Sequence, residues 1–408
     1  MAIGHPRTGS GARHDVMIPR WLPLRSLIVP AVALTLAAPA APRAAPYDSK
    51  ASSAILVDVD SGTILYSKAE DAAFQPAAMA KMMTMAVVFE AIESGKIKLT
   101  DSFPVSEHAW RTGGAPSGSA TMFAALKSHI PVSDLLRGAI VQAGNDACII
   151  LAEGIAGSEG GFVDIMNRKA RELGLKGSHF TNVSGLPDPE QKVTAADLHT
   201  LADHLIRTYP ELYKIYAEPD FTWNKIYQRN RNPLLSAGIG ADGLSTGFTK
   251  ESGFGLTASA MRDGHRMILV VSGLTTDKDR ADEARKLFEW GNTAFERLRF
   301  FNRGEAVAQA RVYGGAAGSV GLVTEEPLDI LLLRGNRERI RARVTYDGPL
   351  LAPVAAGREV GTVRVWVGDT QVLEKPVYTM ADVGQGTMNQ RALDAVQQLL
   401  IGWLPQWN

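Results

Sequence analysis

A lysine that lies three residues after an alanine marks the most informative stretch of the chain, PAAMAKMMT. The alanine is Ala78 and the lysine is Lys81, and both stand at the start of a segment with helical spacing. Residues three apart on a helix share a face, so a serine at position 78 would place its hydroxyl beside the lysine amine. Such a pair would form a nucleophile for acyl transfer. In this chain the amine is present and the hydroxyl is absent.

A second motif, AGN, lies between two helical runs in VQAGNDACIILAE. This frame suits a serine and an asparagine that point into a cleft from a loop between helices. Asn145 is present, and Ala143 occupies the serine position. The same kind of oxygen is therefore missing from a second motif.

A third motif, DGLSTGF, has the pattern of an edge strand that lines a cleft. A glycine at position 247 would let a substrate backbone approach the strand closely, which is one reason to expect Gly247 there. A lysine at position 245 would supply positive charge beside Thr246. The chain has Ser245 instead.

The order of the three motifs resembles the S-x-x-K, S-x-N and K-T-G motifs of the penicillin-recognising enzymes. The pieces KMMT, GNDA, HFTN, GLPDPE, QRNRNPLL and DGLSTGFT are similar to those of exported D-alanyl-D-alanine carboxypeptidases, the low-molecular-mass penicillin-binding proteins. The similarity spans roughly residues 47–295. It implies an α+β, β-lactamase/transpeptidase-like domain and a serine peptidase that trims the terminal D-alanine from peptidoglycan stem peptides.

In this family the first serine is acylated, its lysine is the general base, and the second serine helps to transfer protons. The lysine and threonine of the third motif hold the substrate carboxylate. By position these roles fall on Ala78, Lys81, Ala143, Ser245 and Thr246, with Asn145 and Gly247 at the remaining motif positions and Ala80 in place of the usual threonine. Loss of the nucleophile alone costs about a millionfold in rate. We therefore predict a pseudoenzyme that binds stem peptides or β-lactams without reacting, or that acts as a scaffold.

An active D,D-carboxypeptidase with a relocated nucleophile is the alternative. No serine lies three residues before any lysine, so Ser245 would have to serve, with Lys81 reaching across the cleft. Replacements introduced to trap a complex are a third explanation. Experiments of that kind usually replace a single residue. The four replaced positions, Ala78, Ala80, Ala143 and Ser245, therefore favour natural divergence.

Other motifs have simpler explanations. Gly238–Gly243 fits G-x-G-x-x-G, but no βαβ unit surrounds it, which indicates a glycine-rich turn. His199 and His204 are five residues apart, a poor spacing for two ligands on one helix face, so we expect no zinc and no cofactor. Cys148 lies in an apolar helical run, which favours a buried side chain over a reactive thiol.

The charge balance gives no reason to expect a nucleic-acid partner. The 408 residues contain 43 basic and 43 acidic side chains, so no net field favours phosphate. The N-terminus is more informative. Arg20 and Arg25 precede a short, alanine-rich apolar run that ends in small residues, which is typical of a secretory signal. Met17 is an alternative start, and cleavage fits Ala38–Ala40 or a site near Ala45. We predict an exported, periplasmic protein.

The elements that must position the motifs are helices framed by strands. Alternating residues predict hairpins over 52–68 and 254–274. Helical spacing occurs over 76–93, 132–142, 145–157, 162–174, 194–209 and 283–298. In the first of these helices we expect one apolar stripe, made by Met82, Ala86, Phe89 and Ile92. Strands at both ends with helices between them indicate an antiparallel sheet.

The character of the chain changes near Phe300, where short alternating runs replace helical spacing. In TVRVWV, Val363, Val365 and Val367 should face one way and Arg364 the other. We therefore expect a signal peptide (1–45), a carboxypeptidase-like domain (46–298), a small all-β domain (299–381) and an amphipathic C-terminal helix (382–408).

The last segment places Leu393, Val396, Leu400 and Trp403 on one helical face, with Asp394, Gln397 and Gln398 opposite. Such a helix could lie in the surface of the inner membrane. Packing on the protein itself or on a partner explains the pattern equally well.

Overall fold

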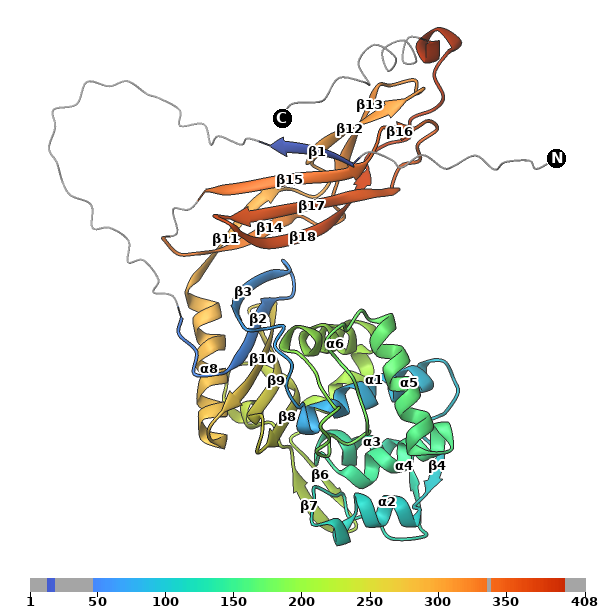
Figure 1. Ribbon diagram of the computed structural model, residues 1–408, viewed down its shortest axis with the longest axis vertical. Coiled ribbons are helices and arrows are strands. Elements are labelled where there is room, and N and C mark those ends of the chain that lie inside the picture. The colour runs from blue at the N-terminus through green and yellow to red at the C-terminus, as the bar shows by residue number, and fades with distance from the viewer. Residues whose placement is uncertain (1–12, 19–46, 336–338, 393–408) are drawn as a thin grey trace, which may run out of the picture. The chain divides into compact units, whose positions relative to one another are not determined.

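The computed structural model describes residues 13–18, 47–335 and 339–392. The chain divides into two compact units, which we describe separately. The larger unit comprises Ala45–Asp60 and Ile64–Ala294, and the smaller is built mainly from Phe295–Asn408, as far as these ranges are described. The predicted α+β domain and the all-β domain that follows it are both confirmed (Figure 1).

A five-stranded sheet forms the centre of the larger unit, with the strand order β3-β2-β10-β9-β8. The β2–β10, β10–β9 and β9–β8 pairs are antiparallel. Its strands are β2 (Ser53–Asp58), β3 (Thr63–Lys68), β8 (Ala241–Thr249), β9 (Gly253–Arg262) and β10 (His265–Leu274). Both expected hairpins are therefore present. The third motif lies on β8 at the edge of the sheet, as predicted.

Helices occur in each of the segments that showed helical spacing. They are α1 (Lys81–Glu93), α3 (Val132–Ile140), α4 (Asn145–Ala156), α5 (Glu159–Glu172), α6 (Ala195–Thr208) and α8 (Asp277–Thr293). The short helices α2 (Glu107–Thr112) and α7 (Pro210–Tyr213) lie outside the predicted segments. The side chains of Ser106, Ser158, Thr194 and Thr276 each accept a hydrogen bond from a first-turn backbone N–H, which explains where α2, α5, α6 and α8 begin.

The residues expected on one apolar stripe of α1 do pack in the core, but burial is not confined to that stripe. Every residue from Lys81 to Phe89 is buried, because α1 lies between α3, α4, α5 and α6 on some sides and β8 on another. A helix surrounded in this way is apolar on all faces. The short 3₁₀ helix η1 (Ala77–Ala80) leads directly into it, so Ala78 and Lys81 are held by the core of the unit.

Short elements connect the larger ones. They are β4 (Ser102–Pro104), β5 (His129–Pro131), β6 (Asp220–Trp223), β7 (Ile226–Arg229), η2 (Ala115–Ser117), η3 (Lys214–Ala217) and η4 (Pro233–Ser236). The helix expected to run to residue 298 ends earlier, at Thr293. Phe295 already pairs with Leu333 in the two-stranded sheet of β11 and β14, and that pairing takes the backbone out of the helix.

The smaller unit has a seven-stranded sheet with the order β1-β15-β17-β18-β13-β12-β16, beside the β11–β14 pair. The strands are β1 (Arg13–Ile18), β11 (Phe295–Phe301), β12 (Ala308–Tyr313), β13 (Ser319–Val323), β14 (Leu328–Leu333), β15 (Ile340–Asp347), β16 (Leu350–Leu351), β17 (Glu359–Val367) and β18 (Thr370–Thr379). Val363, Val365 and Val367 are buried on one side of β17 and Arg364 lies on the other, as the alternation predicted.

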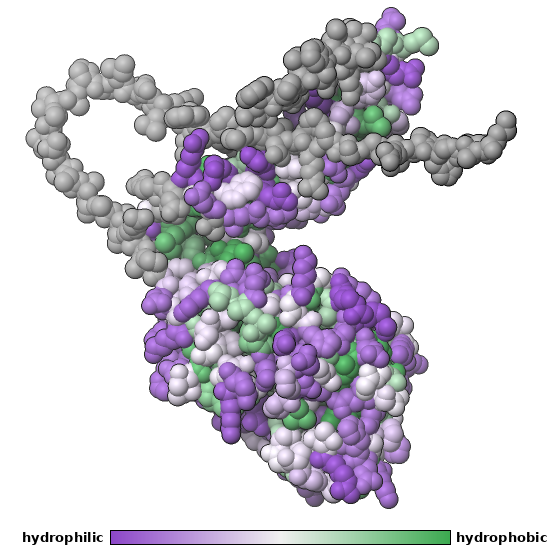
Figure 2. Space-filling model, viewed as in Figure 1, coloured by the Kyte–Doolittle hydropathy of each residue, from purple (hydrophilic) through white to green (hydrophobic). Residues whose placement is uncertain are grey.

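Both ends of the chain extend beyond the described residues. The apolar run of the predicted signal lies outside them, whereas Arg13–Ile18, N-terminal to that run, forms β1. Residues 388–392 are helical, and residues 393–408 of the predicted amphipathic helix lie outside the described ranges. The predicted start at residue 382 is wrong, because Val383 and Gln385 form β-bridges with Val354 and Gly315 and the helix begins only at residue 388. None of the described helices is both long enough and apolar enough to cross a membrane. In the view of Figure 2, the surface of the larger unit is mostly hydrophilic, with small hydrophobic patches.

Candidate functional site

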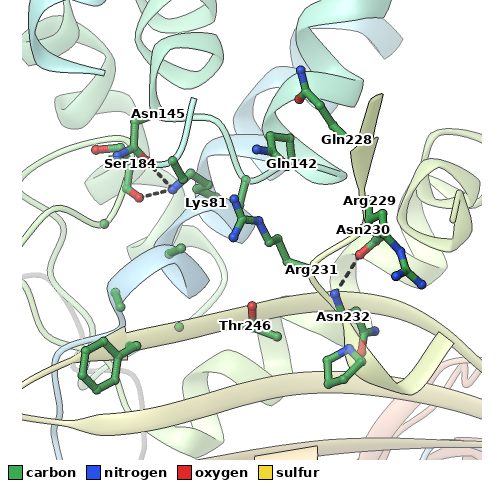
Figure 3. A pocket seen from close by; sticks show the side chains of 18 of the residues that line it. Lys81, Gln142, Asn145, Ser184, Gln228, Arg229, Asn230, Arg231, Asn232 and Thr246 are labelled. Atoms are coloured by element: carbon green, nitrogen blue, oxygen red, sulfur yellow. Dashed lines mark hydrogen bonds between the residues drawn. The ribbon is translucent and has the colours of Figure 1, made fainter. Parts of the chain in front are cut away.

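A cleft of about 840 Å³ in the larger unit brings the three motifs together. Six of the seven predicted site residues line it, namely Ala78, Lys81, Ala143, Asn145, Thr246 and Gly247. Ser245 is not among the lining residues. The walls come from η1 and α1, from the α3–α4 loop, from residues 184–187, from the β7–η4 segment and from β8 (Figure 3).

Lys81 is buried at the base of this cleft, with 4% of its surface exposed. Its Nζ atom donates to Asn145 Oδ1 at 2.7 Å and to the Ser184 carbonyl oxygen at 2.5 Å. Burial lowers the pKa of the amine from 10.5 to about 8, helped by the charge of Arg231 and opposed by Cys148 and Asp146. The base expected by the resemblance is therefore positioned, and its pKa is close to neutrality.

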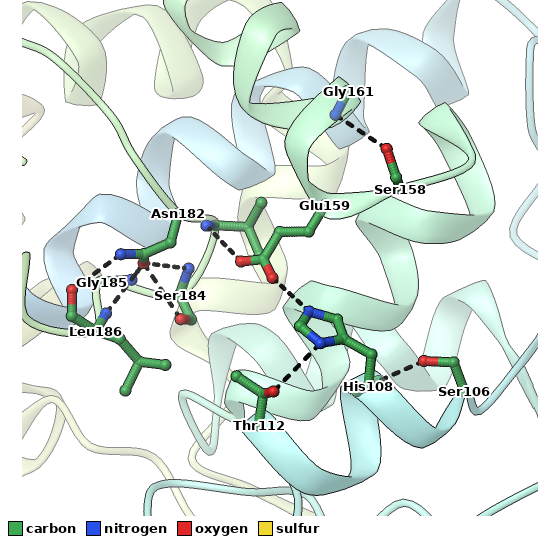
Figure 4. A network of polar contacts seen from close by, with 12 residues as sticks. Ser106, His108, Thr112, Ser158, Glu159, Gly161, Asn182, Ser184, Gly185 and Leu186 are labelled. Carbon is green, nitrogen blue, oxygen red and sulfur yellow. Dashed lines mark hydrogen bonds and ion pairs between the residues drawn. The ribbon is translucent and has the colours of Figure 1, made fainter.

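The loop that carries the Ser184 carbonyl is held by Asn182. The Asn182 side-chain oxygen accepts backbone N–H groups of Ser184, Gly185 and Leu186 at 3.2, 2.8 and 3.1 Å (Figure 4). Gly185 lies so close to η1 that a Cβ atom would be 1.8 Å from the Ala77 carbonyl oxygen. Turn formation thus explains Asn182, and the turn aims a backbone oxygen at the amine of Lys81.

A second polar group supports the same loop. Glu159, the first residue of α5, accepts the Val183 backbone N–H at 3.3 Å and lies 2.8 Å from His108 Nε2. His108 also contacts Thr112 within α2 (Figure 4). On α1, the Thr84 hydroxyl donates to the Val183 carbonyl at 2.6 Å. The loop is therefore bonded to α1 and α5, and α2 supports it through the contact of His108 with Glu159.

Asn145 is the first residue of α4, and its Nδ2 atom donates to Ser119 Oγ at 3.0 Å. Ala143, just before it, has a left-handed backbone with φ of 58°. The next residue, Asp146, is fully buried, and its carboxylate accepts from the Thr121 hydroxyl and from the backbone N–H groups of Met122, Ala124 and Ala147. This carboxylate joins the first turn of α4 to residues 121–124 and thereby fixes the position of Asn145.

In the third motif, the Ser245 hydroxyl donates to the Ala78 carbonyl oxygen at 3.2 Å. The Ser245 side chain on β8 is therefore hydrogen-bonded to the backbone of η1. Packing within the chain gives a reason for glycine at position 247 that we did not predict. A Cβ atom there would lie 2.6 Å from the Pro76 carbonyl oxygen and 3.1 Å from Ala77 Cβ, so the protein's own backbone requires the glycine.

Sequence reasoning missed the main cation of the cleft. Arg231, between β7 and η4, extends toward Lys81 in Figure 3, and its backbone N–H donates to the Val141 carbonyl at 3.2 Å. Lys81, Arg229 and Arg231 give the lining an excess of positive charge, because the further cation Arg280 pairs with Asp277. Arg231 lies in QRNRNPLL, a piece that we used for the resemblance. The resemblance assigned no role to this arginine.

Apolar side chains border the cleft. Phe123, Ile226, Tyr227 and Phe248 line it and remain 38–60% exposed. The cleft thus combines a polar, cationic base with an apolar rim. This combination fits a ligand that has both an anionic group and an apolar part.

This geometry does not favour Ser245 as a relocated nucleophile. No hydrogen bond joins the Ser245 hydroxyl to Lys81 Nζ within the described ranges. The hydroxyl donates to Ala78 and the amine donates to Asn145 and Ser184. A nucleophile needs its base within hydrogen-bond reach.

The remaining sequence motifs have structural roles. Cys148 is fully buried, as predicted, and burial raises the pKa of its thiol to about 12. His199 lies on α6, where burial lowers its pKa to about 4. Gly238 and Gly240 adopt positive φ in the turn before β8. Among the described residues, no group of three or more histidine, cysteine, aspartate or glutamate side chains could hold a metal ion.

Known proteins share both units. Residues 39–276 match the family described as D-alanyl-D-alanine carboxypeptidase, and residues 295–385 match the C-terminal domain of penicillin-binding protein 5. The chain is 39% identical to the D-alanyl-D-alanine carboxypeptidase DacD of Escherichia coli, over 86% of this chain and 91% of that protein. It is 38% identical to DacC of the same organism, over 86% and 89%.

Solved structures give the same result. Penicillin-binding protein 5 from Haemophilus influenzae is 39% identical, with a TM-score of 0.73 over 84% of this chain and 99% of that chain. Penicillin-binding protein D2 from Listeria monocytogenes, in its ampicillin-bound form, is 28% identical, with a TM-score of 0.53 over 61% of this chain and 100% of that chain.

Proposed function

Because the chain belongs to the D-alanyl-D-alanine carboxypeptidase family, we propose that it is a member that binds peptidoglycan stem peptides in cell-wall metabolism without hydrolysing them. The observation that carries this proposal is Ala78 beside a fully positioned Lys81. The amine is held by Asn145 and Ser184, and position 78 offers it no hydroxyl to activate. Loss of such a nucleophile costs about a millionfold in rate.

Binding can survive where hydrolysis does not. Replacement of a serine by alanine removes one oxygen and leaves the backbone in place, so the cleft keeps its shape. At position 245 the lost lysine removes about 1–3 kcal/mol of carboxylate binding. Arg231 and Arg229 keep the lining positive, which supports recognition of the terminal carboxylate of a stem peptide.

The protein acts in the periplasm in this proposal. The support is the secretory pattern at the N-terminus, with Arg20 and Arg25 before the apolar run. The amphipathic pattern of residues 389–408 would add contact with the inner-membrane surface. A liposome co-sedimentation assay with and without residues 382–408 tests that contact, and equal sedimentation would contradict it.

A fluorescent penicillin tests the absence of serine chemistry. We expect no ester-linked adduct on the purified protein after denaturing electrophoresis, and no D-alanine released from a pentapeptide at high protein concentration. An active relative assayed in parallel is the positive control. A penicilloyl ester on any serine, located by peptide mapping, would overturn the proposal.

Isothermal titration calorimetry tests binding itself. A pentapeptide that ends in D-Ala-D-Ala should bind, and the same peptide with an amidated C-terminus should bind at least tenfold more weakly. Arg231→Gln should reduce this preference for the free carboxylate. Equal affinity for the two peptides would show that the cationic lining does not read the carboxylate.

A further inference from the structure

We propose that Lys81 is a covalent binding site for small carbonyl compounds that carry a carboxylate, which it holds reversibly as an imine. The site shares the cleft of the proposed function, but it does not depend on stem-peptide binding or on the lost serine. In this proposal the Lys81 amine is itself the nucleophile.

The hydrogen bonds of Lys81 fit a neutral amine with a free lone pair. A neutral amine has two N–H bonds and one lone pair. Asn145 Oδ1 and the Ser184 carbonyl oxygen accept those two N–H groups. Neither acceptor can donate a proton back from these atoms, and no other hydrogen bond to Nζ occurs in the described part of the chain. A serine at position 78 would have donated to the lone pair, and Ala78 leaves it open.

The electrostatic surroundings support the neutral form. The titratable and charged groups that act on Lys81 are Asp146 and the Cys148 thiol of α4, which favour the ammonium, and Arg231, which disfavours it. Burial outweighs all three, and the pKa falls to about 8. At pH 7, about one amine in ten is therefore neutral, against about one in three thousand for a lysine with the ordinary pKa of 10.5. A lysine that is desolvated and lies near another cation is a known type of amine nucleophile.

The cleft has room for the electrophile and a partner for its charge. Ala78 and Ala143 end at their methyl groups and line the same cleft as Lys81. Its volume of about 840 Å³ exceeds the needs of a molecule with a few heavy atoms. Arg231 lines this space and extends toward Lys81 in Figure 3, so its guanidinium can pair with a carboxylate while the carbonyl carbon faces the amine.

The chemistry needs no oxidant or reductant. The Nζ lone pair attacks the carbonyl carbon, a C–N bond forms, and the carbonyl electron pair moves to oxygen. That oxygen takes a proton, and the nitrogen loses one, which gives a carbinolamine. Loss of the hydroxyl as water, with loss of the second nitrogen proton, gives the imine. Addition of water reverses each step and returns the free amine.

Reductive trapping tests the proposal on the full-length protein. Glyoxylate is the carboxylate probe, propanal is the neutral probe, and cyanoborohydride converts each imine to a stable secondary amine. Mass spectrometry of the digested protein then gives the labelling rate at each lysine. We expect Lys81 to react with glyoxylate at least tenfold faster than Lys169, a partly buried lysine that pairs with Glu90 and Glu172. Comparable rates at the two lysines would overturn the proposal.

The variants and the pH profile separate the parts of the mechanism. The labelling rate at Lys81 should rise with pH to half its maximum near pH 8, and a midpoint above about 10 would contradict a neutral amine. Arg231→Gln should slow glyoxylate more than propanal, and an equal effect on both would remove the carboxylate from the proposal. Ala78→Ser should slow both, because the new hydroxyl occupies the lone pair. Binding of stem peptides is measured by calorimetry without reductant, and imine formation is measured by reductive trapping without stem peptide. A negative result in one experiment therefore does not decide the other.

Discussion

The amine of Lys81 should make the stability of the protein depend on pH in a way that one substitution abolishes. We consider Lys81→Met, which keeps an unbranched side chain of similar length and removes the titrating group. At neutral pH two effects oppose each other in this variant. The cost of burying the amine disappears, while Asn145 Oδ1 and the Ser184 carbonyl lose their donor. These two effects are hard to separate at a single pH. The pH dependence of the free energy of unfolding instead reports the titration of the amine.

The sign follows from the lowered pKa. Below about pH 8 the amine is protonated in the folded and the unfolded protein, so it adds no pH dependence. Between about 8 and 10.5 the unfolded chain still binds a proton that the folded protein has released, so the free energy of unfolding rises with pH. The slope is about 1.4 kcal/mol per pH unit, which gives about 3 kcal/mol over the whole interval. Above that interval both forms are neutral and the dependence ends.

Urea unfolding, followed by tryptophan fluorescence from about pH 7 to about pH 10, measures the effect. The free energy of unfolding of the wild type minus that of Lys81→Met should increase across this range. Lys169→Met is the matched control. Partial burial opposes a higher pKa at Lys169, but its hydrogen bonds to Glu172 and Glu90 raise it, so the corresponding difference should stay flat over the same range. A flat difference for Lys81→Met as well would refute the depressed pKa and the reasoning built on it.

Three further substitutions test the cleft. Ala78→Ser alone should leave D-alanine release at least a hundredfold below that of an active relative, because the second and third motifs stay incomplete; full recovery would show that those motifs are dispensable. Asp146→Ala should cost about 3–5 kcal/mol in urea unfolding, since it leaves buried donors without an acceptor, whereas Asp164→Ala on the exposed face of α5 should change stability by less than about 0.5 kcal/mol. Gly247→Ala should cost about 1–3 kcal/mol through contact with the Pro76 carbonyl, and an unchanged Tm would contradict the packing explanation.

Local patterns predicted most of the elements, because the periods of helices and strands are properties of short segments. These local patterns were less reliable where packing against distant parts of the chain determines which faces of a helix are buried or where the helix ends. The helix α1 is buried on every face, so it shows no single stripe, and its neighbours along the chain do not reveal that. The helix α8 ends at Thr293 because Phe295 pairs with Leu333, a partner far away in the sequence.

The sequence by itself determined the spacing of Ala78 and Lys81, the order of the three motifs and the replacement of two serines and one lysine in them, because these are statements about residue types along the chain. Only the tertiary structure decided what surrounds the amine. Its acceptor on Ser184 lies 103 residues away, and Arg231 reaches the cleft from another loop. The pKa of a lysine depends on burial and on such distant charges, so it arises only when the chain closes these loops around the amine.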